Sequence, residues 1–243
     1  MSKKTTIFIP ARMASTRFPG KPLAPIDGIP MVVYCARNAK ETGLDVFVCT
    51  DTKEVVSVCD LYGIPSILTP EFNTGTDRVA FAVNEIETDY VINLQGDEPL
   101  INLSSLSLLI NKLNVLDVES KEIISGVSYV SSDEAFDPNV VKCALIKKDS
   151  SIQYFSRKPL LNLPENSKNP PYLKQLGLYG MTKDTLKEFA SLPQGDLEQS
   201  EKVELLRWIE NGRKVLGCVI DQKTVSVDTP NDLVDALEII YKK

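Results

Sequence analysis

The first 100 residues alternate between short apolar runs and helical stretches, and this alternation restricts the fold more than any other feature. The apolar runs predict β-strands at residues 6–9, 46–49, 66–68 and 90–94. The stretches between them predict helices at residues 30–42, 53–62 and 76–86. Strands that are apolar along their whole length are typical of parallel βαβ units, in which helices cover both faces. We therefore expect an α/β fold with a doubly wound, mostly parallel sheet, whose ligands lie beyond the carboxyl ends of its strands.

The second half of the chain is less regular. Further strands are predicted at residues 126–130, 140–147, 176–181 and 214–220, and a closing helix at 231–241. Residues 198–211 predict the strongest helix, with Val203, Leu206 and Ile209 on one face and Gly212 as its C-cap. The Pro-rich residues 158–172 predict a loop or a dimer contact. Four aromatic residues are either interface anchors or plain core: Phe136, Tyr154, Phe155 and Trp208. We find no repeat and no low-complexity linker, which favours one domain over residues 1–243 with a smaller lobe.

Among its 243 residues the chain has no histidine. This excludes Ser-His-Asp and Cys-His nucleophilic machinery and histidine-bound zinc, so an enzyme of this sequence would use carboxylates, lysines, arginines and an oxygen-bound metal. Five scattered cysteines without a CxxC pair disfavour both a disulfide framework and a thiolate metal site.

The charge and the hydropathy pattern exclude further classes. A formal net charge of -6 disfavours non-specific binding to nucleic acid, which needs a basic surface. No apolar run approaches the roughly 20 residues of a membrane span, and the run at residues 7–9 is too short for a signal peptide. We expect a cytoplasmic protein without membrane insertion.

A basic loop follows the first predicted strand. Residues 7–26 contain Arg12, Arg17 and Lys21 but no acidic residue, although the whole chain is acidic. Backbone N–H groups and guanidinium groups in such a loop can bind a polyphosphate, and Ser15 and Thr16 add hydroxyl donors. The alternative is a solvated basic loop, but its place after the first strand favours anion binding. It is no Walker A loop, and no GxGxxG fingerprint is present.

Two aspartates are candidate metal ligands. Gly96 allows a sharp turn at the end of the strand near residue 94, so that Asp97 is presented at the ligand-binding edge. A carboxylate that faces a phosphate-binding loop suggests Mg²⁺; the alternative is a turn carboxylate that caps the next helix. Asp228 is either a second ligand or a helix start signal, with Asp228 or Thr229 as N-cap and Pro230 in the first turn.

The motifs together resemble a known family. The segments PAR at 10–12 and STRFPGKPL at 15–23 are similar to the opening signature of sugar-acid cytidylyltransferases. The similarity is greatest to the 3-deoxy-manno-octulosonate (Kdo) cytidylyltransferase family, and it extends over nearly the full length in family order. The further matching segments are residues 49–51, 74–78, 93–99, 154–157, 176–179, 198–212 and 227–230.

This resemblance implies a nucleotide-diphospho-sugar transferase fold with a smaller sugar-binding and dimerisation lobe, a homodimer and a Mg²⁺ cofactor. The implied reaction transfers CMP from CTP to the anomeric hydroxyl of a 2-keto-3-deoxy sugar acid and releases pyrophosphate, for lipopolysaccharide biosynthesis.

The resemblance also implies a role for individual residues. Arg12, Lys21 and Asp97 would be catalytic, and Asp97 and Asp228 would hold the metal. The residues implied to bind the nucleotide are Pro10, Ala11, Arg12, Arg17, Lys21, Thr50, Asp51, Thr74, Gly75, Arg78 and Gln95. The residues implied to bind the sugar are Gln95, Arg157, Gln175, Tyr179 and Glu204.

The chain departs from the family pattern at three positions. Phe72 and Gln175 stand where the family commonly has histidine, and Leu205 stands where it has glutamine. Because Gln175 and Leu205 fall where the family binds sugar, an altered acceptor is one hypothesis, namely 8-amino-3,8-dideoxy-manno-octulosonate. Neutral drift in an ordinary Kdo enzyme is the alternative. A catalytically silent nucleotide-binding relative and an enzyme for a sialic-type acid or a polyol phosphate are further alternatives.

Overall fold

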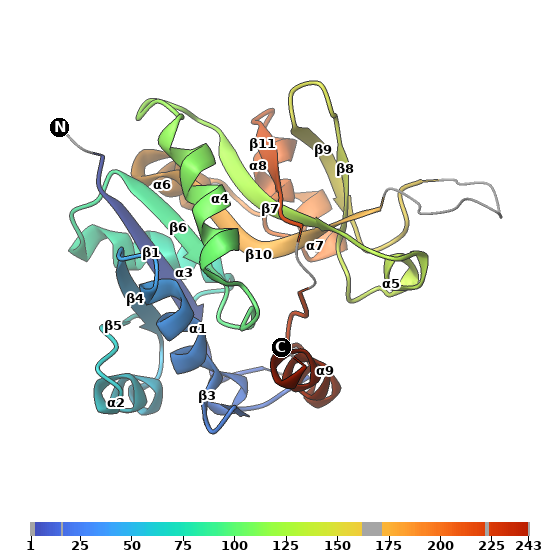
Figure 1. Ribbon diagram of the computed structural model, residues 1–243. Helices are drawn as coiled ribbons and strands as arrows, with labels where there is room; N and C mark the ends of the chain where they lie inside the picture. The colour runs from blue at the N-terminus through green and yellow to red at the C-terminus, as the bar shows by residue number, and fades with distance from the viewer. Residues whose placement is uncertain (1–2, 16, 162–171, 222–223, 243) are drawn as a thin grey trace.

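The computed structural model describes residues 3–15, 17–161, 172–221 and 224–242. They form a nine-stranded sheet in the order β5-β4-β1-β6-β10-β7-β11-β9-β8 (Figure 1). Its strands are β1 (Thr5–Ala11), β4 (Asp45–Thr50), β5 (Ser66–Leu68), β6 (Tyr90–Leu94), β7 (Ile123–Tyr129), β8 (Lys142–Leu145), β9 (Ser151–Ser156), β10 (Leu173–Thr182) and β11 (Val215–Val219). A small separate hairpin consists of β2 (Pro25–Ile26) and β3 (Ile29–Pro30).

The helices of the described residues connect or flank these strands. The α-helices are α1 (Met31–Lys40), α2 (Lys53–Leu61), α3 (Gly75–Ala82), α4 (Leu103–Asn114), α5 (Ser132–Phe136), α6 (Lys183–Ser191), α7 (Asp196–Glu201), α8 (Leu206–Glu210) and α9 (Pro230–Tyr241). Two short 3₁₀ helices are η1 (Lys21–Leu23) and η2 (Val83–Glu85). None of the helices in these described ranges is long and apolar enough to cross a membrane.

The sheet is mostly parallel, as predicted. Strands β5, β4, β1 and β6 are parallel to one another. Strand β10 is antiparallel to β6 and β7, and β11 is again parallel to β7. Strand β9 is antiparallel to β11, so β9 and β10 run against the direction of the other strands. One reversed strand, β10, therefore lies in the middle of the sheet, and the other, β9, lies next to its edge.

Helices cover both faces of the sheet, which confirms the doubly wound α/β prediction. Neighbouring residues of β1 point to opposite faces of the sheet: Ile7 and Ile9 belong to one core cluster, and Phe8 belongs to the other. The first cluster includes residues of α1, α2 and α4, and the second includes residues of α3, α6 and α8. Figure 1 shows α1 and α4 in front of the sheet and α3 and α6 behind it.

The strands and helices predicted in the first 100 residues are all present, within two residues for most ends. The prediction omitted α4, α5, α6, β9 and the hairpin of β2 and β3, although Leu106, Leu109 and Leu113 of α4 do follow a helical spacing and are buried. Asn102 begins α4 by accepting a hydrogen bond from the backbone N–H of Ser105.

The single helix predicted at residues 198–211 is wrong. Helix α7 ends at Glu201, Lys202 has a left-handed φ of 56°, and α8 begins at Leu206. The carbonyls of Glu201 and Lys202 accept hydrogen bonds from the guanidinium of Arg157, instead of from the helical N–H groups four residues on. The prediction that Gly212 ends this helical segment was correct, since Gly212 has a φ of 68° just after α8.

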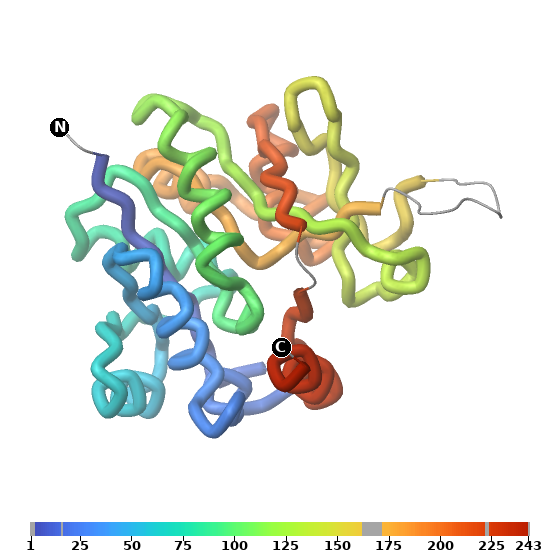
Figure 2. Tube along the Cα trace, viewed as in Figure 1, coloured from blue at the N-terminus to red at the C-terminus, as the bar shows by residue number. Residues whose placement is uncertain are grey.

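Helix α9 brings the end of the chain back to its beginning. Thr229 is its N-cap and forms a capping box with Asp232, while Pro230 lies in the first turn. Leu233 and Leu237 pack on the core cluster that contains Ile26, and Figure 2 shows α9 beside this early segment. The segment before α9 is fixed to the end of β6, because the N–H of Val227 donates to the carbonyl of Asp97 at 2.8 Å.

Candidate active site

Two adjoining cavities lie at the carboxyl ends of β1 and β6. The first, of about 490 Å³, is lined by the loop after β1, the start of α3, the end of β6 and the turn after α7. The second, of about 340 Å³, is lined by β10, the segment from α5 to β8 and the residues before α9. Five residues line both cavities: Asp97, Lys202, Val203, Glu204 and Asp228.

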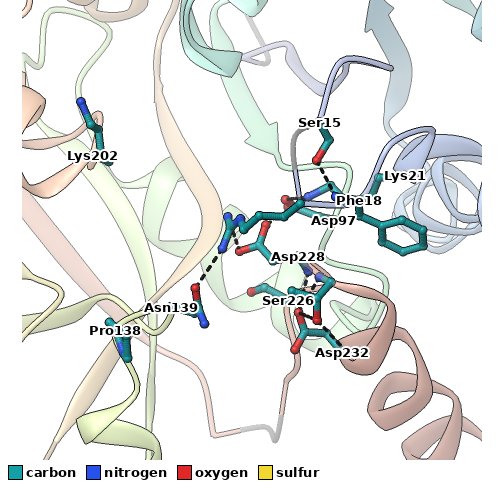
Figure 3. A network of polar contacts seen from close by, with 12 residues as sticks. Ser15, Phe18, Lys21, Asp97, Pro138, Asn139, Lys202, Ser226, Asp228 and Asp232 are labelled. Carbon is teal, nitrogen blue, oxygen red and sulfur yellow. Dashed lines mark hydrogen bonds and ion pairs between the residues drawn. The ribbon is translucent and has the colours of Figure 1, made fainter.

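A cationic loop meets two aspartates where the cavities join. The Nζ atom of Lys21 lies 2.7 Å from Oδ2 of Asp97 and 3.2 Å from Oδ1 of Asp228. A guanidinium nitrogen of Arg17 lies 3.0 Å from the other oxygen of Asp228. Burial alone would lower the pKa of Lys21, but the two carboxylates raise it above its ordinary value. The loop after β1 and the two aspartates therefore form one cluster (Figure 3).

This aspartate pair fits a divalent cation. Both carboxylates converge on the single ammonium of Lys21, so they already surround the position of one cation. Two carboxylates suit Mg²⁺, which takes oxygen ligands and keeps waters and substrate oxygens in its shell. Within the described ranges no group of three or more His, Cys, Asp or Glu residues could hold a metal. A metal at Asp97 and Asp228 would therefore take its other ligands from water and substrate.

Most residues assigned to the nucleotide by resemblance line the first cavity. These are Pro10, Ala11, Arg12, Arg17, Lys21, Thr74, Gly75, Arg78 and Gln95. Thr50 and Asp51 are not among its lining residues. The side chain of Thr50 is fully buried, and Oδ2 of Asp51 forms a 2.7 Å ion pair with Arg78. Asp51 thus orients Arg78. Thr16, which was expected to add a hydroxyl donor to the basic loop, lies outside the described residues.

Gln95 is held between two glycines at the end of β6. A Cβ atom on Gly75 would lie 2.9 Å from Oε1 of Gln95, and one on Gly177 would lie 2.8 Å from its Cβ. The N–H of Gln95 donates to the carbonyl of Gly177 at 2.7 Å, and its side-chain amide donates to Asn93. A larger residue at either glycine would force these neighbours of Gln95, or Gln95 itself, to shift.

The remaining residues assigned to the sugar line the second cavity. They are Arg157, Gln175, Tyr179 and Glu204. The amide of Gln175 donates to the hydroxyl of Tyr179 at 3.1 Å, and Glu204 accepts a 3.1 Å hydrogen bond from the N–H of Thr76. Burial raises the pKa of both Tyr179 and Glu204. Leu205 is fully buried in the core and lines neither cavity, whereas Phe72 lines the first.

The guanidinium of Arg157 has backbone partners. Its Nε donates to the carbonyl of Glu201 at 2.7 Å, and its terminal nitrogens donate to the carbonyls of Pro138 at 2.9 Å and Lys202 at 3.4 Å. Arg157 therefore holds the turn between α7 and α8, in addition to lining the second cavity.

Sequence reasoning missed two residues of this site. Glu98 lies in the quoted 93–99 motif but received no role, although its buried carboxylate lies beside Asp97 and lines the second cavity. Lys202 lines both cavities, yet the predicted helix gave it an ordinary surface position. Lys202 lies in the turn where that helix breaks, and Arg157 donates hydrogen bonds to the carbonyls of this turn.

A doubly wound sheet with a cationic loop opposite paired aspartates at its carboxyl edge defines a nucleotide-binding α/β protein. The chain matches the Cytidylyltransferase family over residues 6–215 and belongs to that family. It is 39% identical to a 3-deoxy-manno-octulosonate cytidylyltransferase of Wolinella succinogenes, over 96% of this chain and 98% of that protein. The family resemblance inferred from the sequence is thereby confirmed.

Two further relatives bear on the substrate. An 8-amino-3,8-dideoxy-manno-octulosonate cytidylyltransferase of Shewanella sp. strain ANA-3 is 38% identical, over 94% of this chain and 95% of that protein. A solved CMP:2-keto-3-deoxy-manno-octonic acid synthetase in complex with CTP is 32% identical. It superposes with a TM-score of 0.88 and covers 99% of each chain.

Proposed function

We propose that this protein transfers CMP from CTP to the anomeric hydroxyl of a 2-keto-3-deoxy sugar acid of the Kdo type and releases pyrophosphate. The observation that carries the proposal is the Lys21, Asp97 and Asp228 cluster at the junction of two cavities. The full-length relatives that act on Kdo-type acids, and the similar synthetase solved with CTP, support it. The product would enter lipopolysaccharide biosynthesis, and the enzyme would be cytoplasmic and homodimeric.

The two cavities divide the substrates between them. CTP would occupy the first cavity, with its triphosphate near Lys21 and near the exposed guanidinium of Arg12, which has no protein partner within the described residues. The acceptor acid would occupy the second cavity. Its hydroxyl would then meet the α-phosphate at the junction, so catalysis consists mainly of positioning and neutralising charge.

Asp97 and Asp228 would hold a Mg²⁺ cofactor. When bound, the ion supplies charge neutralisation at the phosphates and acidifies a nearby hydroxyl. The chain's own contribution lies in Lys21, whose ammonium would bind phosphate oxygens once the aspartates have another cation. Arg17 would keep Asp228 oriented through their 3.0 Å ion pair.

The lining of the second cavity favours the 8-amino acid as a second candidate acceptor. Besides the aspartate pair, its lining includes the carboxylates of Glu134, Asp137, Asp232 and Asp235. These carboxylates would attract an ammonium group on the acceptor, whereas they would not attract a neutral hydroxyl group in the same way. Kdo enzymes are among the relatives at 36% to 39% identity and 8-amino-Kdo enzymes among those at 37% to 38%, so both acids are candidate acceptors.

The test is release of pyrophosphate from CTP and Mg²⁺ with Kdo, 8-amino-Kdo or N-acetylneuraminate. We expect turnover with one or both octulosonates and none with the nine-carbon acid. Asp97→Asn should lower turnover roughly 100-fold or more while CTP still binds, and the exposed Asp60→Asn is its matched control. Binding of CTP without any pyrophosphate release would instead identify a silent relative, and an active Asp97→Asn enzyme would contradict the metal role.

A further inference from the structure

Lys202 occupies a position between the two cavities that no other lysine or arginine of the described residues shares. It lies in the turn between α7 and α8 and lines both cavities. Its side chain is exposed, and its ammonium has no hydrogen bond or ion pair with any described residue. Figure 3 shows Lys202 across from the cluster of Lys21, Asp97 and Asp228, with no contact drawn to it.

The backbone that carries Lys202 is held firmly. Its N–H donates to the carbonyl of Glu198 at 2.8 Å, and its left-handed φ of 56° turns the chain out of α7. Strand β9 braces this turn from the other side. The guanidinium of Arg157 donates to the carbonyls of Glu201 and Lys202, and the carboxylate of Glu201 accepts from the N–H of Arg157 at 2.8 Å and from Ser156 at 3.1 Å. The structure thus fixes where the Lys202 side chain starts.

The second cavity needs a cation for an acidic ligand. Its lining contains many carboxylates: Asp97, Glu98, Glu134, Asp137, Glu204, Asp228, Asp232 and Asp235. Against them stand Arg157, Lys174 and Lys202. Lys174 is buried and donates to the carbonyl of Thr224 at 2.7 Å, and Arg157 donates to three backbone carbonyls. Among the cavity's cations, Lys202 alone has a charged group without an acceptor in the described residues.

We propose that Lys202 binds the carboxylate of the acceptor sugar acid, and that Arg157 acts as a positioning residue by holding the Lys202 turn. This inference rests on the proposed function. A carboxylate that enters a cavity rich in carboxylates is repelled unless a cation meets it. The triphosphate has less need of Lys202, because Arg12 and Lys21 already line the first cavity.

The first experiment compares steady-state constants of the wild type with those of Lys202→Met. We expect the KM for the octulosonate to rise about 10- to 100-fold, the loss typical of one charged hydrogen bond, while the KM for CTP stays within about twofold. Lys202→Arg should retain most of the acceptor affinity. Lys53→Met, which removes an exposed charge on α2, is the matched control.

The second experiment replaces the acceptor by its uncharged carboxamide. The wild type should prefer the acid to the amide, and Lys202→Met should lose that preference, a result that general damage to the fold would not give. Arg157→Lys should also raise the KM for the acid. In the Lys202→Met background it should add little, because both changes act through the same contact.

An unchanged KM for the acid in Lys202→Met, or a preserved preference for acid over amide, overturns the inference alone. A rise in the KM for CTP instead would assign Lys202 to the triphosphate and also overturn it. Absence of turnover in the wild type with either octulosonate would overturn the proposed function, and this inference with it.

Discussion

Glu98 follows Asp97 in the sequence and is buried, with 2% of its surface exposed. One of its carboxylate oxygens accepts hydrogen bonds from the N–H of Gly177 at 2.7 Å and from the hydroxyl of Ser226 at 2.6 Å. The other oxygen is buried without a partner among the described residues. Burial, and then the charge of Asp97, raise the pKa of Glu98. The residue thus joins β10 and the segment before α9 to the end of β6, but its ionised form is disfavoured there.

The raised pKa of Glu98 predicts a pH-dependent stability. Because the folded value exceeds the unfolded value of about 4.3, the stability that Glu98 contributes is full below the unfolded pKa and is lost as pH rises through the folded one. Compared with Glu98→Gln, the wild type should therefore become relatively less stable between pH 4.5 and pH 7.5. Urea unfolding at both pH values measures this, with the exposed Glu87→Gln as control. An identical difference at both pH values would contradict it.

Among the helices around the site, Arg207 joins α8 to α7 and α3. Its guanidinium forms two 2.8 Å hydrogen bonds with the buried carboxylate of Glu198 and one of 2.9 Å with Asp77. Only 2% of Arg207 and 4% of Glu198 is exposed. This contact fixes the two helices on either side of Lys202 and Glu204, so the site depends on it.

Arg207→Met should destabilise the fold by about 3–5 kcal/mol, because it leaves the charge of Glu198 buried and unpaired. The double variant Glu198→Gln/Arg207→Met should recover a large part of that loss. Denaturant unfolding of the wild type, both single variants and the double variant measures the coupling. If the double variant is as unstable as the sum of the two single variants, the buried pair is not the cause.

The sequence predicted some of these elements correctly and others not. The parallel half of the sheet could be predicted because its strands and helices are set by local apolar periodicity. The break after α7 could not, because its cause is a guanidinium 44 residues away in sequence. Lys21 and Asp97 lie 76 residues apart, and their approach was predicted because both follow strand ends at the ligand-binding edge. Asp228 lies 207 residues from Lys21, and only the family motifs favoured its role as a ligand over that of a helix start signal. Thr50 and Leu205 show the limit of motifs, which do not tell a lining residue from a buried neighbour.

Two exposed aromatic residues lie on the surface of the molecule, at the ends of β7 and α5. Tyr129 and Phe136 are 55% and 69% exposed and flank the small cluster of Val130, Ala135 and Tyr172. Of the other aromatic anchor candidates, Phe155 and Trp208 are fully buried in the core, and Tyr154 is half-buried and packs on the same core cluster. The predicted dimer segment 158–172 lies largely outside the described residues, and its described end at Tyr172 is buried in this small cluster.

We expect the protein to be a homodimer whose interface includes Phe136, since aromatic residues are enriched in such interfaces. Sedimentation equilibrium should give about twice the chain mass of 26.9 kDa. Phe136→Asp should raise the dimer dissociation constant about 10- to 100-fold, because it places a charge where an aromatic anchor is desolvated. Val115→Asp, at an 81% exposed site after α4, is the control and should leave the dimer intact. A monomeric wild type, or a dimer that Val115→Asp dissociates and Phe136→Asp does not, would place any interface elsewhere.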